Sequence, residues 1–106
     1  MKKVISAIRD LYPEAIGIYL VGSVARGEPK PDSDIDILIL CQEDTDGWRL
    51  VCRDHPLWRD FPTINGRKAD YIVQPKNGPT VGQYRHRERL GLPNPMVSVW
   101  EVGHAH

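Results

Sequence analysis

The stretch from Tyr19 to Leu40 reads YLVGSVARGEPKPDSDIDILIL, and it decides the fold that we expect for the chain. An apolar run ends in Gly22 and Ser23, and a polar loop that contains two prolines follows. Asp34 and Asp36 then stand two positions apart at the start of a second apolar run. A glycine and a serine at a tight turn suit a phosphate group, and paired aspartates suit a divalent metal ion. The stretch therefore predicts a site for a metal-bound nucleoside triphosphate.

The composition of the chain indicates one domain, residues 1–106, with a single modest core. Fourteen basic and fourteen acidic residues cancel, which argues against nucleic acid or a membrane surface as a partner. No apolar run approaches the roughly 20 residues that cross a bilayer. Cys41 and Cys52 are too few for a disulfide scaffold and lack zinc spacing. We interpret them as reduced thiols in a cytoplasmic protein.

The hydrophobic pattern predicts alternating helices and strands. Helical structure is expected at residues 2–12, 23–27, 48–58 and 80–90. Strands are expected at residues 15–21, 35–40, 68–73 and 96–102. Pro56 interrupts the third helical segment, and Asn65 followed by Gly66 predicts a tight turn before the third strand. This order predicts an α/β (α+β) domain with a small mixed sheet and flanking helices.

The three aspartates of the predicted sheet are candidate metal ligands. Alternate side chains of a strand share a face, so Asp34 and Asp36 point the same way while Ile35 points into the core. At roughly 5 Å and an effective dielectric of about 20, two such carboxylates repel each other by about 3 kcal/mol. A divalent cation converts that repulsion into attraction. Asp70 interrupts the apolar run of the third strand and is the best candidate for a third carboxylate, which would permit two metal ions.

Each of these residues also has an ordinary structural interpretation. Taken singly, an aspartate at a strand start is more often solvated than catalytic, and only the joint arrangement with Gly22 and Ser23 favours a site. Arg26 either binds a phosphate or pairs with an aspartate of the loop. Ser33 either contacts the nucleotide or hydrogen-bonds locally to shape the turn into Asp34.

These residues resemble the minimal nucleotidyltransferase (MNT) family, within the DNA polymerase beta-like nucleotidyltransferase superfamily. The superfamily pattern is a hydrophobic residue, then Gly, then Gly or Ser, about ten further residues, Asp-hydrophobic-Asp, and a later carboxylate on a strand. The corresponding residues here are Val21, Gly22, Ser23, Asp34, Ile35, Asp36 and Asp70. The resemblance covers roughly residues 15–73 and implies a nucleotidyltransferase palm fold.

The resemblance also implies an activity, which is magnesium-dependent transfer of AMP from ATP with release of pyrophosphate. Gly22 and Ser23 would hold the triphosphate. Independently of the resemblance, Arg26 and Ser33 are our further candidates for nucleotide binding. Asp34 and Asp36 would ligate the Mg²⁺ ions. Asp70 would help to bind a second Mg²⁺ and activate the acceptor oxygen.

Small members of the family often act as antitoxins, and in some systems they adenylylate a tyrosine of a helical HEPN-type toxin. The resemblance therefore implies a protein acceptor of that kind, and we expect so short a domain to need a partner to supply the acceptor. Two alternatives stay open at this point. The chain could neutralise a partner by binding alone, or it could modify a nucleic-acid end or a small molecule.

Overall fold

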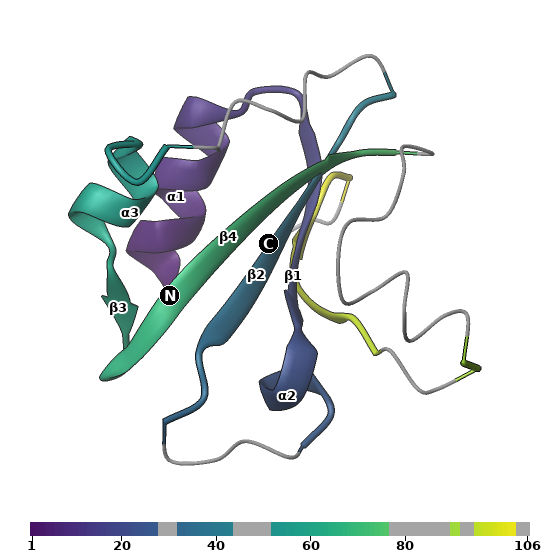
Figure 1. Ribbon diagram of the computed structural model, residues 1–106. Coiled ribbons are helices and arrows are strands. Elements are labelled where there is room, and N and C mark those ends of the chain that lie inside the picture. The colour runs from purple at the N-terminus through teal and green to yellow at the C-terminus, as the bar shows by residue number, and fades with distance from the viewer. Residues whose placement is uncertain (28–31, 44–51, 77–89, 92–94, 104–106) are drawn as a thin grey trace.

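The computed structural model describes residues 1–27, 32–43, 52–76, 90–91 and 95–103 (Figure 1). A five-stranded sheet in the order β3-β4-β2-β1-β5 forms its centre. The elements are α1 (Lys2–Leu11), β1 (Ala15–Val21), α2 (Gly22–Ala25), β2 (Ile35–Cys41), α3 (Pro56–Asp60), β3 (Thr63–Ile64), β4 (Arg67–Pro75) and β5 (Val97–Glu101). The pair β2 and β4 is parallel, whereas the other neighbouring strands are antiparallel. The prediction of a small mixed sheet with flanking helices is confirmed.

Apart from the helix expected at 48–58, the expected elements agree with the observed ones to within a few residues where the structure describes them. The four predicted strands correspond to β1, β2, β4 and β5, and β4 extends from Arg67 to Pro75 rather than over 68–73. The helix expected at 80–90 falls, except for Leu90, outside the described residues. None of the described helices is long and apolar enough to cross a membrane.

The helix expected at 48–58 is corrected by the structure, because Pro56 begins α3 and does not interrupt it. Proline suits the first position of a helix, where its missing N–H would have no partner in any case. His55 caps the helix, and its Nδ1 accepts a hydrogen bond from the Leu57 N–H at 3.3 Å. The proton of the neutral ring then lies on Nε2, which donates to the Tyr12 hydroxyl oxygen at 3.0 Å and ties α3 to the end of α1.

A tight turn joins β3 to β4, as the Asn65-Gly66 pair predicted. Both residues have positive φ, 52° at Asn65 and 81° at Gly66, as a type I′ hairpin turn requires. The turn reverses the chain so that β4 starts at Arg67, beside the segment that leads into β2.

The core lies between the sheet and the two longer helices. Figure 1 shows α1 and α3 together on one side of the sheet, and α2 at the end where β1 stops and β2 starts. Ile37 and Ile39 of β2 are completely buried in this core, and the register pairs them with Tyr71 and Val73 of β4. Other buried members of the cluster are Val4, Ile8, Tyr12, Ala15, Ile18, Ile35, Cys41, Leu57, Ile64 and Ala69. The alternate residues of β2, Asp36 among them, therefore face the opposite side of the sheet.

Candidate active site

The sheet register brings two of the predicted carboxylates side by side. Asp36 near the start of β2 pairs with Asp70 of β4 in the parallel ladder, and with Val21 at the end of β1 in the antiparallel one. Hydrogen-bonded strands lie about 4.8 Å apart, so the two aspartates are neighbours on the face that α1 and α3 leave uncovered. The first residue after β1 is Gly22. One end of the sheet thus carries the glycine turn and both carboxylates.

Gly22 lies directly against Asp36. Its φ of 72° is in the left-handed region, which favours glycine. A Cβ atom at this position would overlap the Oδ2 atom of Asp36. The backbone of the turn can approach the carboxylate only because residue 22 has no side chain. A sequence motif that first indicated phosphate contact is therefore also a packing requirement of the acidic cluster.

The charge environment of Asp36 is unfavourable for its ionised form. Burial and, to a smaller extent, the negative charges of Asp70 and Asp34 together raise the pKa of Asp36 to about 6, while the Arg26 guanidinium acts in the opposite direction. The other two predicted carboxylates, Asp34 and Asp70, therefore both act electrostatically on Asp36. Arg26, at the C-terminal end of α2, contributes its positive charge to the same cluster.

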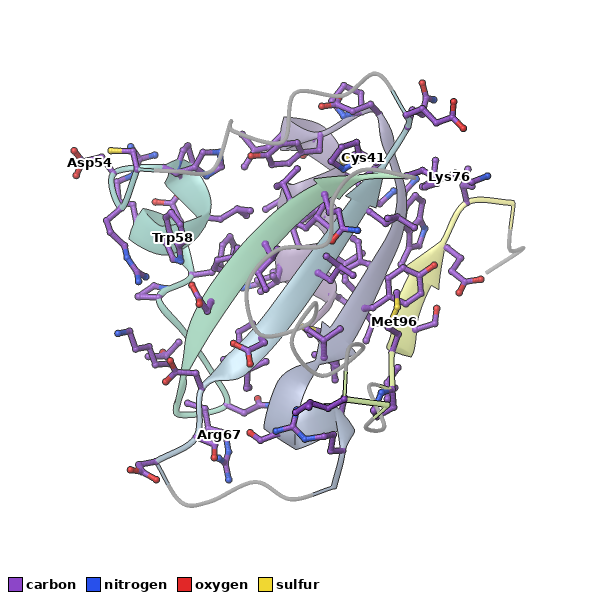
Figure 2. The ribbon with its side chains drawn as sticks, turned by 45° about the vertical axis from the view of Figure 1, so that its right-hand side comes forward. Cys41, Asp54, Trp58, Arg67, Lys76 and Met96 are labelled. Atoms are coloured by element: carbon purple, nitrogen blue, oxygen red, sulfur yellow. The ribbon has the colours of Figure 1, made fainter. Side chains whose placement is uncertain are left out.

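The remaining predicted residues lie on the two segments that flank the carboxylates. Ser23 is half-buried in α2, and Asp34 is exposed just before β2 begins. The backbone carbonyl of Ser33 accepts a hydrogen bond of 3.2 Å from the Arg67 guanidinium. This contact joins the residue before Asp34 to Arg67, which is labelled in Figure 2, at the start of β4, so Arg67 helps to position the segment that contains Asp34.

Two arginines near the site were not found from the sequence. Arg67 contacts Ser33, and the Arg53 Nη1 lies 3.9 Å from the Asp70 Oδ1. Both contacts join residues that are far apart in the chain, and both depend on the position of β4. Neither arginine belongs to a recognisable motif, so no local pattern would have indicated them.

The donor set of the cluster fits a hard divalent cation, although the side chains do not form a complete coordination sphere. Within the described ranges, no group of three or more histidine, cysteine, aspartate or glutamate side chains is arranged to hold a metal ion. Magnesium commonly takes only one or two carboxylates together with substrate phosphates, so a complete protein cage is not required. The ligands are oxygen atoms, and the mutual repulsion that raises the pKa of Asp36 is the kind that a cation relieves. The structure thus brings Asp36 and Asp70 together as two carboxylates that could hold such an ion with substrate phosphates, but it does not arrange Asp34 with them as the predicted third ligand.

The structure is similar to the crystal structure of a provisionally assigned nucleotidyltransferase from Sulfolobus solfataricus, with a TM-score of 0.53. The two chains share 24% sequence identity, and the match covers 95% of this chain and 77% of the other, which shows a common fold. No curated protein matches the sequence. The sequence profile of the nucleotidyltransferase domain matches residues 1–90, which include every candidate site residue, and the chain therefore belongs to the nucleotidyltransferase domain family.

Proposed function

We propose that the protein transfers AMP from ATP to a protein acceptor in a reaction that requires Mg²⁺. The observation that carries this proposal is the pairing of Asp36 with Asp70 across β2 and β4, with Gly22 packed against the Asp36 carboxylate. Membership of the nucleotidyltransferase domain family supports the transferase chemistry. The choice of AMP, magnesium and a protein acceptor follows from the resemblance to minimal nucleotidyltransferases.

The proposed mechanism is an in-line displacement at the α-phosphorus of ATP. The acceptor oxygen forms a bond to the α-phosphorus, the bond to the oxygen that bridges the α- and β-phosphates breaks, and pyrophosphate leaves. Bound Mg²⁺ would neutralise the charge that develops on the phosphate oxygens. Asp34 and Asp36 would hold the cation, and Asp70 would take part in metal binding and accept the proton of the acceptor hydroxyl group.

The nucleotide-binding side of the site comprises the turn after β1 and the segment before β2. Gly22 and Ser23 would contact the triphosphate, because the turn carries no side chain at its first position and a hydroxyl group at its second. Arg26 adds a positive charge that already acts on Asp36 and would also attract the triphosphate. Ser33, whose carbonyl accepts a hydrogen bond from Arg67, would be a further nucleotide contact on the segment before β2.

The acceptor that we propose is a helical HEPN-type toxin, for which this protein would be the antitoxin. The experiment incubates the purified protein with ATP labelled at the α-phosphate, Mg²⁺ and the candidate toxin, and follows label on the toxin. Asp36→Asn should lower the rate of transfer by about a thousandfold or more, because it removes one negative charge from the cation site. Asp10→Asn is the matched control, since Asp10 is an exposed aspartate of α1, and it should transfer label as the wild type does.

The outcomes separate the proposal from its alternatives. If no label is transferred and the wild type and Asp36→Asn protect cells from the toxin equally, the protein neutralises its partner by binding, and the proposal is wrong. Label on an RNA end or on a small molecule, with none on the protein, would retain the chemistry but reject the protein acceptor.

A further inference from the structure

Arg53 is held beside the acidic cluster by two contacts from different elements. Its guanidinium lies over the Trp58 ring, 4.6 Å from the ring centroid, and its Nη1 lies 3.9 Å from the Asp70 Oδ1. Arg53 precedes α3, whereas Asp70 lies in β4. The guanidinium therefore links the helical side of the protein to one of the proposed metal ligands.

The Trp58 ring on which this guanidinium lies packs against a residue of the core. Trp58, labelled in Figure 2, belongs to α3, and its ring meets the Tyr71 ring edge-on at a centroid distance of 6.4 Å. Tyr71 follows Asp70 in β4, is 3% exposed, and donates a hydrogen bond of 2.7 Å to the Phe61 carbonyl. Because the indole rests on a fixed ring, it defines where the Arg53 guanidinium lies, although the Arg53 side chain itself is 64% exposed.

Asp70 thus meets a positive charge on one side and a negative one on the other. Its own charge raises the pKa of Asp36, so the two carboxylates repel each other, and Arg53 offsets part of the negative charge of Asp70. A divalent cation between Asp36 and Asp70 would neutralise the negative charge of Asp70 much more strongly than Arg53 does. Arg53 and the cation are therefore competitors for one carboxylate.

We propose that Arg53 is a positioning residue for Asp70. In the metal-free protein, the Arg53 guanidinium holds the Asp70 carboxylate and lowers the affinity of that carboxylate for a divalent cation. This inference rests on the proposed function, since it takes Asp70 as a metal ligand. Substrate phosphates supply the remaining ligands in such sites, so the competition favours metal binding together with the nucleotide over binding of the metal alone.

The test measures binding of Mn²⁺ alone to the full chain by electron paramagnetic resonance, with circular dichroism as a check of folding. Arg53→Ala should bind Mn²⁺ about two- to fivefold more tightly than the wild type, the range expected when an exposed ion pair is lost. Arg53→Lys keeps the charge but lacks the planar group that stacks on Trp58, and its affinity should lie between the two. In an Asp70→Asn background, Arg53→Ala should change nothing, because the carboxylate for which it competes is absent.

Arg59→Ala is the matched control for this experiment. The Arg59 side chain is also 64% exposed and also pairs with an aspartate, Asp60, at 3.1 Å, but that aspartate is not part of the site. The Arg59→Ala variant should therefore bind Mn²⁺ with the same affinity as the wild type. Loss of general positive charge from the surface would instead shift Arg53→Ala and Arg59→Ala equally, which would overturn the inference.

The remaining outcomes separate the inference from the function on which it rests. If Asp70→Asn weakens Mn²⁺ binding while Arg53→Ala equals the wild type or binds more weakly, the role of Arg53 is wrong and the metal site stands. If Mn²⁺ binding depends on neither Asp36 nor Asp70, the proposed metal site is wrong, and the inference falls with it.

Discussion

The two faces of the sheet differ most sharply at Asp36 and Ile37, which are adjacent in β2. Ile37 points under the helices and is completely buried among apolar side chains. Asp36 points to the other face, where a glycine turn and two further aspartates meet it. The first face lowers the free energy of the fold, whereas the second holds like charges together at a cost. This cost is the physical reason why we propose a cation ligand for the second face.

The largest effect on stability is expected from Ile37→Ala, which tests the helix-covered face. Removal of a fully buried isoleucine side chain should lower the free energy of unfolding by about 2–5 kcal/mol. Urea denaturation measures this loss, with Asp36→Asn as the comparison. Asp36→Asn should keep or slightly increase stability, because it removes a repelled charge. A large loss of stability in Asp36→Asn would mean that the acidic face supports the fold, and the contrast would be wrong.

Gly22→Ala should have the next largest effect, and Gly27→Ala is its matched control. Both glycines have positive φ, 72° and 74°, so alanine costs roughly 1–2 kcal/mol of backbone strain at either position. Only at Gly22 would the added methyl group overlap the Asp36 carboxylate, whereas no described atom lies within 4 Å of a Cβ at Gly27. Gly22→Ala should therefore lose transfer activity and additional stability.

The measurements for this pair are the rate of label transfer and the free energy of unfolding. Equal losses at Gly22 and Gly27 in both would show that strain alone matters at the turn. The close packing of Gly22 on Asp36 would then have no effect on transfer activity.

The smallest effect is a pH dependence of stability in the metal-free protein. The pKa of Asp36 is about 6 in the folded protein, against an ordinary value of 3.8. The folded state therefore binds more protons than the unfolded state between these values, and the contribution of Asp36 to stability falls as the pH rises through this window. Because Asp36 is only partly buried, solvent screens its charge, and we expect a change of only about 1 kcal/mol.

The difference in unfolding free energy between the wild type and Asp36→Asn, measured from pH 4 to 7, isolates this contribution from that of other carboxylates. The variant should gain stability relative to the wild type as the pH rises, and saturating Mg²⁺ should reverse the difference at pH 7. A difference that does not change with pH would contradict the charge environment that we assign to Asp36.

The local pattern of the sequence was sufficient for β1, β2, β4 and β5, whereas the two-residue strand β3 was not predicted. Alternation predicted that Asp36 and Ile35 face opposite sides of the sheet, with Ile35 in the core, because the side-chain period of a strand is two wherever the strand lies. The Asn65-Gly66 turn followed from the need for positive φ at both positions. The start of α3 was wrong, since the meaning of Pro56 depends on whether a helix begins or continues there, and the contacts of His55 with Leu57 and Tyr12 decide it.

By itself, the sequence determined which residues are chemically suited to a nucleotide and a metal ion, since composition and spacing set those properties within one segment. Only the tertiary structure decided that Asp70 lies beside Asp36, because the parallel register of β2 and β4 joins residues 34 positions apart. The same register allows Arg67 to hold Ser33, and the packing of Trp58 on Tyr71 brings Arg53 to Asp70. Such contacts arise from the way the chain closes on itself, and no local pattern encodes them.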